Sequence, residues 1–311
     1  MSKKIKIVHY KRASFTDPTI SLQSALSAAL ASASLADDRR QQFTDDEHIY
    51  RLINQHKKYS GMLFGQFITY EKGKKQPQVE LGTGVSSYPV STSDPGRNRA
   101  FADEIFYFGI RENDLICSQT RSMRTREFEA YLHWLLTENG IVASDVSLYL
   151  HDQPPTDVSD KLQQGSVKSL RVGTDITSTS TAGTEESKKT HEISGVGANW
   201  LRGVLGIDKF DKLNLSNDLD DANLKIYIEV KFLRKTDEQG QRAIDSIVSS
   251  MRHIDGTDYT LKLNNDVTIK GSELSISGTV STPVLPSGLL DEAVLYKDMH
   301  DWLLKTLLEN L

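Results

Sequence analysis

The chain has 311 residues, of which 38% are apolar and 25% charged, and its formal net charge is −5. This composition supports a buried core and excludes a wholly disordered chain, and the length fits one large domain or two ordinary ones. The single cysteine, Cys117, excludes an internal disulfide framework, and we find neither a signal-peptide pattern nor an apolar run near the roughly 20 residues of a membrane span, so we expect a cytoplasmic protein.

Apolar and polar residues alternate at strand or helix spacing through the first half of the chain. Thr44, with Glu47 three residues later, has the pattern of a capping box and predicts the start of a helix. Asn139 and Gly140 are typical of a helix C-terminus. The expected elements are, in chain order, strand 4–10, helix 21–31, helix 44–56, a hairpin of strands 62–70 and 78–82, loop 86–99, a hairpin of strands 104–109 and 114–118, helix 125–138 and strand 145–150.

The segment 151–160, which contains Pro154 and Pro155, is the best candidate for a domain boundary. We therefore expect an N-terminal domain at 1–153 and a C-terminal domain at 154–311. The elements expected in the second domain are an extended segment 166–174, a flexible loop 175–192, an apolar helix 195–206, strand 224–233, helix 240–253, a meander of strands 258–263, 267–269 and 273–278, and helix 289–311.

The expected fold class is α+β, with two halves of mainly antiparallel sheet, flanking helices and a long C-terminal helix. The apolar positions of that last helix suit packing against the sheet or against a second subunit. A two-fold dimer contact through this helix, or through the apolar helix around Trp200, is therefore a prediction.

Four cations gather where strand 224–233 ends and the next helix begins: Lys231, Arg234, Lys235 and Arg242. A helix N-terminus offers backbone N–H groups that favour phosphate, and the cations supply neutralising charge. The backbone of duplex DNA requires this combination. The corner therefore predicts a phosphate-binding surface, although a solvated, charged sheet edge explains the same residues.

The segment 230–235 (VKFLRK), followed by 243–247 (AIDSI), resembles the phage-exclusion, or abortive-infection, proteins of the RexA-like family. The upstream segment 204–207 (VLGI), the strand at 258–263 and the final helix follow in the order that the family shows. The resemblance spans most of the chain in order, without a signature motif.

This resemblance implies a homodimer that binds double-stranded DNA with little sequence preference, acts in phage exclusion and works with a membrane-channel partner. The DNA contacts of the family correspond here to Lys231, Arg234 and Lys235. Glu229 and the acidic pair at 237–238 depart from the more basic pattern of the family.

Further cations extend the candidate surface. Lys74 and Lys75 lie on an expected hairpin turn, and Arg124 precedes helix 125–138, where its charge opposes the helix dipole. An unfavourable cation at that position suggests an anionic partner, while a solvated loop is the simpler explanation. We include these three residues among the DNA-binding candidates.

Two other functions remain open. Glu229 and Lys231 share a strand face, and with Asp220 or Asp221 upstream they match the acid, Glu-x-Lys pattern of metal-dependent nucleases. Alternatively, the chain is a protein-binding sensor of phage components that does not touch DNA.

No pair of histidines has zinc-binding spacing with a cysteine, and Cys117 lies in an expected strand as a core residue rather than a nucleophile. We therefore expect no metal, no cofactor and no catalytic residue. The sequence predicts a non-enzymatic, sequence-nonspecific DNA-binding protein that acts as a sensor or activator in antiviral defence.

Overall fold

The computed structural model describes residues 2–42, 48–79, 90–97, 99–120, 123–165, 167–175, 177–180, 191–194, 225–231 and 259–310. The chain divides into two compact units. The first unit contains Met1–Pro155 together with Ser275–Leu311, and the second contains Thr156–Leu274.

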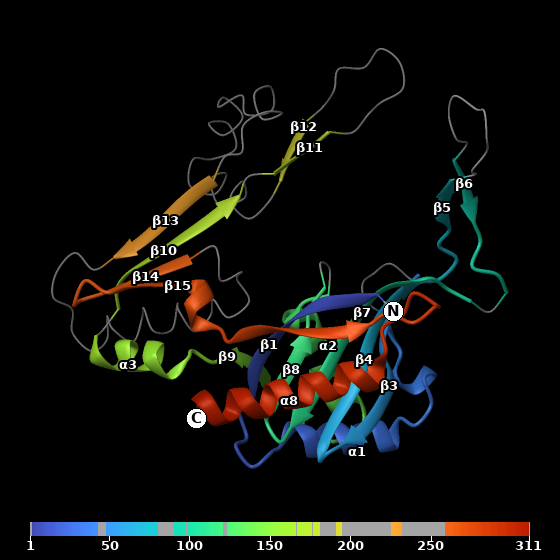
Figure 1. The fold of residues 1–311 in the computed structure, drawn as a ribbon, viewed down its shortest axis with the longest axis horizontal. Coiled ribbons are helices and arrows are strands. Elements are labelled where there is room, and N and C mark those ends of the chain that lie inside the picture. Colours follow the sequence, from blue (N-terminus) through green and yellow to red (C-terminus); the bar gives the residue numbers. More distant parts are fainter. Residues whose placement is uncertain are drawn as a thin grey trace. The chain divides into compact units, whose positions relative to one another are not determined.

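The first unit is built on an eight-stranded antiparallel sheet (Figure 1). The strand order is β16 (Ser277–Pro283), β1 (Lys3–Phe15), β8 (Asp114–Ser118), β7 (Ala102–Arg111), β4 (Met62–Glu71), β3 (Ile49–Tyr59) and β2 (Gln41–Gln42). The eighth strand, β9 (Leu148–Asp152), pairs with the second half of β1, whose first half pairs with β16. Separately, β5 (Gln76–Val79) and β6 (Val90–Ser93) form a two-stranded sheet.

One face of the large sheet is covered by α1 (Leu22–Ser32) and α2 (Thr125–Glu138). The aromatic centre of this core is Phe128 of α2, whose ring centroid lies 4.8–5.2 Å from those of three sheet residues: Phe67, Phe106 and Phe108. All four side chains are fully buried.

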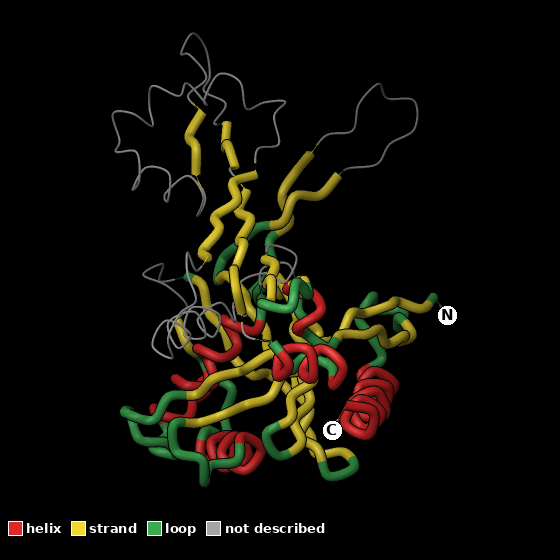
Figure 2. Tube along the Cα trace, turned by 90° about the vertical axis from the view of Figure 1, so that its left-hand side faces the viewer, coloured by secondary structure: helices red, strands yellow, loops and turns green. Residues whose placement is uncertain are grey.

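The other face of the same sheet is covered by α8 (Glu292–Asn310), the helix beside the label C in Figure 2, which crosses the strands in Figure 1. Its Tyr296 stacks on Phe64 of β4, with ring centroids 5.0 Å apart. Tyr107 of β7 belongs to this second core, although its neighbours Phe106 and Phe108 belong to the first. Side chains alternate along a strand, so β7 supplies both cores.

A buried arginine joins the end of α1 to the sheet. Arg39, in a short 3₁₀ helix (Asp37–Arg39), is 5% exposed. It donates hydrogen bonds at 2.9–3.1 Å to four backbone carbonyls, those of Ala33, Ser34, Ile53 and Asn54. The hydroxyl of Tyr131 donates to the carbonyl of Arg39 at 2.8 Å, so α2 is tied to the same point. These bonds satisfy the guanidinium and offset the cost of its burial.

The second unit contains a four-stranded antiparallel sheet of order β13 (Lys225–Lys231), β10 (Val167–Asp175), β14 (Tyr259–Leu263) and β15 (Thr268–Lys270). Its core contains Leu170, Leu261 and Ile269, together with Val158 of α3 (Thr156–Gln164). A 3₁₀ helix, η2, follows at Gly271–Leu274. In addition, β11 (Thr177–Ser180) and β12 (His191–Ser194) pair with each other.

The predicted α+β class is confirmed, with antiparallel sheets and a long C-terminal helix. The hairpin of 104–109 and 114–118 is present as β7 and β8, and helix 125–138 is present as α2. The helices expected at 195–206 and 240–253 lie outside the described residues. Within the described residues, no helix has both the length and the apolar content that crossing a membrane requires.

The division into units differs from the expected domains 1–153 and 154–311. A boundary does fall close to residue 153, after Pro155, but residues 275–311 belong with the first unit. The physical reason is that β16 pairs along β1 and α8 buries an apolar sheet face. The strand expected at 273–278 is accordingly divided between η2 and the first residues of β16.

The helix expected at 44–56 is wrong over its described part, because residues 49–59 form β3. Ser60 and Gly61, with φ angles of 47° and 79°, make the two-residue turn that leads into β4. This Ser-Gly pair between apolar segments was the local signal for a hairpin. The pairing expected between 62–70 and 78–82 is therefore wrong as well, since β4 pairs with β3 and β7.

Two expected loops also contain strands. β6 lies within the expected loop 86–99, and β11 and the start of β12 lie within the expected flexible loop 175–192. Their serine and threonine content suits a β-ladder as well as a loop, because threonine favours strands and backbone pairing needs no apolar face.

Truncation of Phe128 tests the first core. We expect Phe128→Ala to lower the free energy of unfolding by about 3–5 kcal/mol, because it leaves a cavity among three fully buried rings. Urea unfolding followed by circular dichroism measures the change. The control is Leu308→Ala at a position that is 86% exposed, where we expect less than about 0.5 kcal/mol. Equal effects of the two changes would contradict the described core.

Glu292, in the first turn of α8, makes the second core sensitive to pH. Its carboxylate accepts a hydrogen bond from the Gln66 amide, and burial raises its pKa. A raised pKa in the folded state means that the folded chain holds the proton more tightly than the unfolded chain. The contribution of Glu292 to stability is therefore fully present below its ordinary pKa and is lost as the pH rises through the raised one.

We expect Glu292→Gln to be at least as stable as the wild type at pH 7 and to have a weaker decline in stability above pH 5. Urea titrations across this pH range measure both quantities. Glu309→Gln, at the exposed end of the same helix, is the matched control. A Glu292→Gln variant that keeps the pH dependence of the wild type and is less stable at pH 7 would refute the assignment.

Candidate nucleic-acid interface

The four-stranded sheet of the second unit has one buried face and one polar face. Leu170 and its cross-strand partners Val230 and Leu261 alternate with polar residues along their strands. Leu170 and Leu261 are each 1% exposed, which fixes the side that faces the core. The intervening positions therefore lie on the opposite, outward face, where Arg171 and Lys262 are exposed and Ser169, the cross-strand partner of Lys262, is buried.

Two cross-strand rows on this outward face are rich in cations. One row is Glu229, Arg171, Thr260 and Lys270, and the other is Lys231, Ser169, Lys262 and Thr268. The side chains of Arg171, Lys262 and Lys270 are exposed. Because neighbouring strands lie about 4.8 Å apart, these backbone positions fall within about 15 Å across the sheet. A surface of this size spans several phosphates of a duplex. We name these four cation positions, Lys231, Arg171, Lys262 and Lys270, the basic sheet face.

Carboxylates border the basic sheet face. Asp266 pairs with Lys262 at 3.3 Å and with Lys168, at an irregularity of β10, at 3.8 Å. Both pairs are exposed, so each contributes little and is readily exchanged for a competing anion. Glu229 lies opposite Arg171 in the register, and its side chain is exposed.

Of the cations predicted at the strand-to-helix corner, the structure describes only the backbone of Lys231, as the last residue of β13. Arg234, Lys235 and Arg242 lie outside the described residues. The predicted corner therefore remains a prediction. What the structure adds is the neighbourhood of Lys231: Ser169 beside it and Lys262 on the next strand.

Lys74 and Lys75 belong to the first unit and are engaged in ion pairs. The ammonium of Lys74 lies 3.2 Å from Glu71 and 3.0 Å from Asp103, and hydrogen bonds with these carboxylates raise its pKa. Lys75 pairs with Asp94 at 3.3 Å. These contacts fasten the turn after β4 to its neighbours, so each lysine has a local structural role.

Arg124 is the N-cap residue of α2, and its backbone N–H donates to the Glu127 carboxylate at 3.0 Å. The predicted conflict between its charge and the helix dipole is eased by this carboxylate, which lies in the first turn. The helix start therefore needs no anionic partner to be stable.

The nuclease pattern is only partly described. Glu229 is exposed on β13, whereas Asp220 and Asp221 lie outside the described residues. Within the described ranges, no three histidine, cysteine, aspartate or glutamate side chains are grouped as a metal site would require.

Cys117 of β8 is a core residue, as its sequence context predicts. Its side chain is fully buried, and its sulfur lies 4.0 Å from the Thr125 hydroxyl. Burial raises the pKa of the thiol to about 12. The thiolate that a nucleophile needs is therefore scarce at neutral pH.

Comparison with known proteins gives no relative: no family model matches the sequence, and no curated protein matches it significantly.

Sequence reasoning missed three members of the basic sheet face: Arg171, Lys262 and Lys270. The signal was present, because apolar and polar residues alternate through 167–172 and 259–263. The sequence does not show that β10 pairs with both β13 and β14. This pairing places β10 on one sheet face with segments about 60 and 90 residues further along the chain.

The burial of Cys117 predicts that its thiol is protected in the folded chain. At pH 8, a pKa of about 12 leaves on the order of one thiol in 10⁴ ionised. We expect a maleimide or disulfide reagent to label the native protein at least about a hundredfold more slowly than the protein in guanidinium chloride. Mass spectrometry over time measures both rates. Rapid stoichiometric labelling of the native chain would contradict a core position.

Proposed function

We propose that this chain binds double-stranded DNA without base specificity, through the basic sheet face, and acts in phage exclusion as a sensor or activator. The observation that carries the DNA-binding part is the exposure of Arg171, Lys262 and Lys270 on one sheet face that also holds the position of Lys231. The resemblance to the RexA-like family supports the role in phage exclusion.

The proposed mechanism is electrostatic. Cations on a sheet face neutralise phosphates and release condensed counterions, and this supplies affinity without reading the bases. A cationic corner at Lys231, Arg234, Lys235 and Arg242 would continue the same surface at one edge of β13. Base recognition normally requires a helix or ribbon that carries arginine, asparagine or glutamine into a groove. The two rows that contain the basic sheet face hold lysine, arginine, serine, threonine and one glutamate on a broad surface.

Two copies of this surface in a homodimer would hold one duplex at two places, which multiplies affinity without any new kind of interaction. A homodimer, a cytoplasmic location and a membrane-channel partner follow from the family resemblance and from the sequence, and they remain part of the proposal. Lys74, Lys75 and Arg124 are weaker candidates for binding DNA because local carboxylates already satisfy two of them and the third caps a helix.

The proposal is tested by the salt dependence of DNA binding. We expect the triple variant Arg171→Ala, Lys262→Ala, Lys270→Ala to bind a fluorescent duplex about tenfold or more weakly than the wild type. The slope of log affinity against log salt should become shallower by about 0.9 for each phosphate that the variant no longer neutralises. Fluorescence anisotropy at several salt concentrations measures both quantities, and a shuffled duplex tests base specificity.

A matched control replaces three exposed lysines of the first unit, Lys3, Lys4 and Lys58, with alanine. It changes the net charge by the same amount as the triple variant of the basic sheet face. Equal weakening in both triple variants, or none in either, would refute the basic sheet face as the site. A further variant, Lys231→Ala with Arg234→Ala, tests the predicted corner separately.

The same reactions with magnesium address the alternatives. Cleaved DNA whose formation is abolished in Glu229→Gln would replace the proposal with a nuclease. Failure of the wild type to bind any duplex at low salt would favour a sensor that binds a phage protein.

A further inference from the structure

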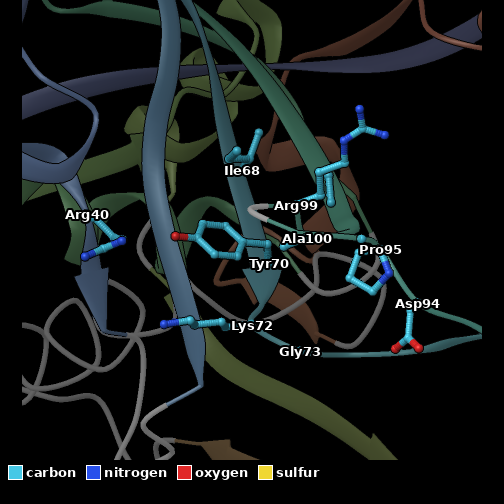
Figure 3. A pocket seen from close by; sticks show the side chains of 11 residues that line it. Arg40, Ile68, Tyr70, Lys72, Gly73, Asp94, Pro95, Arg99 and Ala100 are labelled. Atoms are coloured by element: carbon cyan, nitrogen blue, oxygen red, sulfur yellow. The ribbon is translucent and has the colours of Figure 1, made fainter.

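The first unit contains a pocket of about 670 Å³ beside the end of β4 (Figure 3). It includes no residue of the basic sheet face, all of which belong to the second unit. Its lining comes from β4, the turn after it, the segment that leads into β7 and, with Arg40, the segment before β2.

The lining combines positive charge with an apolar wall. Arg40, Lys72 and Arg99 are its cations. Its one acid, Asp94, is engaged by Lys75 outside the pocket at 3.3 Å. Within the described part of the chain, no carboxylate pairs with Lys72 or Arg99. Among the described residues, the lining therefore carries more positive than negative charge, in a chain whose net charge is −5.

Arg40 is held in place by its neighbours. Its guanidinium lies 5.1 Å from the centroid of the Tyr50 ring and 3.0 Å from the Asp37 carboxylate. Tyr50 stacks on Tyr70, with ring centroids 5.6 Å apart and an interplanar angle of 28°. The Tyr70 hydroxyl faces the same guanidinium and raises its pKa. The ion pair with Asp37 is exposed and is readily exchanged for a competing anion, while the tyrosine rings orient the guanidinium.

The polar and apolar groups lie on different sides of Tyr70. In Figure 3 the Tyr70 hydroxyl, the Arg40 guanidinium and the Lys72 ammonium lie on one side, while Pro95 and Ala100 lie on the other. Arg99 rises beside Ala100. A ligand that fits both sides has two parts. Its anionic group lies near Arg40 and Lys72. Its flat apolar group packs against Tyr70, Pro95 and Ala100.

We propose that this pocket binds a nucleotide, with its phosphate at Arg40 and Lys72 and its base against the Tyr70, Pro95 and Ala100 wall. The volume lies within the range typical of small-molecule sites. Arg99 belongs to the lining beside Ala100, and a guanidinium stacks on flat π systems. The same chemistry occurs in a free nucleotide and at the phosphorylated end of a single strand, and the experiment distinguishes them.

Isothermal titration of the full chain tests the pocket with four probes: a nucleoside monophosphate, the matching nucleoside, inorganic phosphate, and a short single-stranded oligonucleotide with a 5′-phosphate. We expect saturable binding of the nucleotide, with the nucleoside and inorganic phosphate each about tenfold or more weaker, because each lacks one of the two recognised parts. An oligonucleotide that binds at least as well as the nucleotide identifies a strand end as the ligand. One that binds more weakly identifies a free nucleotide.

The variant Lys72→Ala with Arg99→Ala should weaken nucleotide binding by about tenfold or more. Both side chains are exposed, so the fold should be unchanged, and circular dichroism checks this. The matched control is Lys3→Ala with Lys58→Ala, which removes the same charge from positions outside the lining. Tyr70→Phe separates the contribution of the hydroxyl from that of the ring.

The proposal is overturned if no nucleotide binds saturably at millimolar concentration, if the nucleoside binds as tightly as the nucleotide, or if the pocket variant binds like the control. The duplex-binding variants in the second unit leave this pocket intact. Loss of duplex binding and loss of nucleotide binding are therefore separate results.

Discussion

The first unit depends on one constraint, which is that its central strands are apolar on both faces. In β7, Phe106 and Phe108 point into one core and Tyr107 into the other, and in β4 the same holds for Phe67 and Phe64. A sheet with two apolar faces is stable only when both are covered. Helices α1 and α2 cover one face, and the chain must supply a second cover for the other. That cover is α8, from the far end of the sequence.

This requirement explains how the chain is divided. The strands that lead out of the first unit and back into it, β9 and β16, both pair with β1. The second unit is thus inserted in the chain between β9 and β16, which both pair with the long strand β1. A unit whose ends are held in this way folds around its own core, here the cluster of Leu170, Leu261 and Ile269. The exposed cations on the other face of its sheet, Arg171, Lys262 and Lys270, are the basis of the proposed DNA site.

Cations have different roles in this molecule, and their neighbours decide which. Lys11 pairs with Asp152 at 2.5 Å within the sheet, and Arg39 is bound by four carbonyls, so both serve the fold. Lys72 and Arg99 line a pocket without such partners among the described residues. The net charge of −5 does not predict whether any of these sites binds an anion. Binding depends on the charges that lie within about a Debye length of the ligand.

The sequence by itself determined the class of fold, the hairpin of β7 and β8, helices α1, α2 and α8, and the burial of Cys117, because these follow from periodicity and turn residues within short segments. It also marked Lys231, Lys74 and Lys75 as cations at element ends. It misassigned 49–56 as a helix, because Thr44 and Glu47 have the pattern of a capping box, and the pairing with β4 settled the conformation. Only the tertiary structure decided that 275–311 joins the first unit, that Arg171 and Lys262 share a sheet face with the position of Lys231, and that Arg40 meets Lys72 at a pocket. Each of these joins residues distant in the chain, and strand register and packing, rather than local propensity, determine such neighbours.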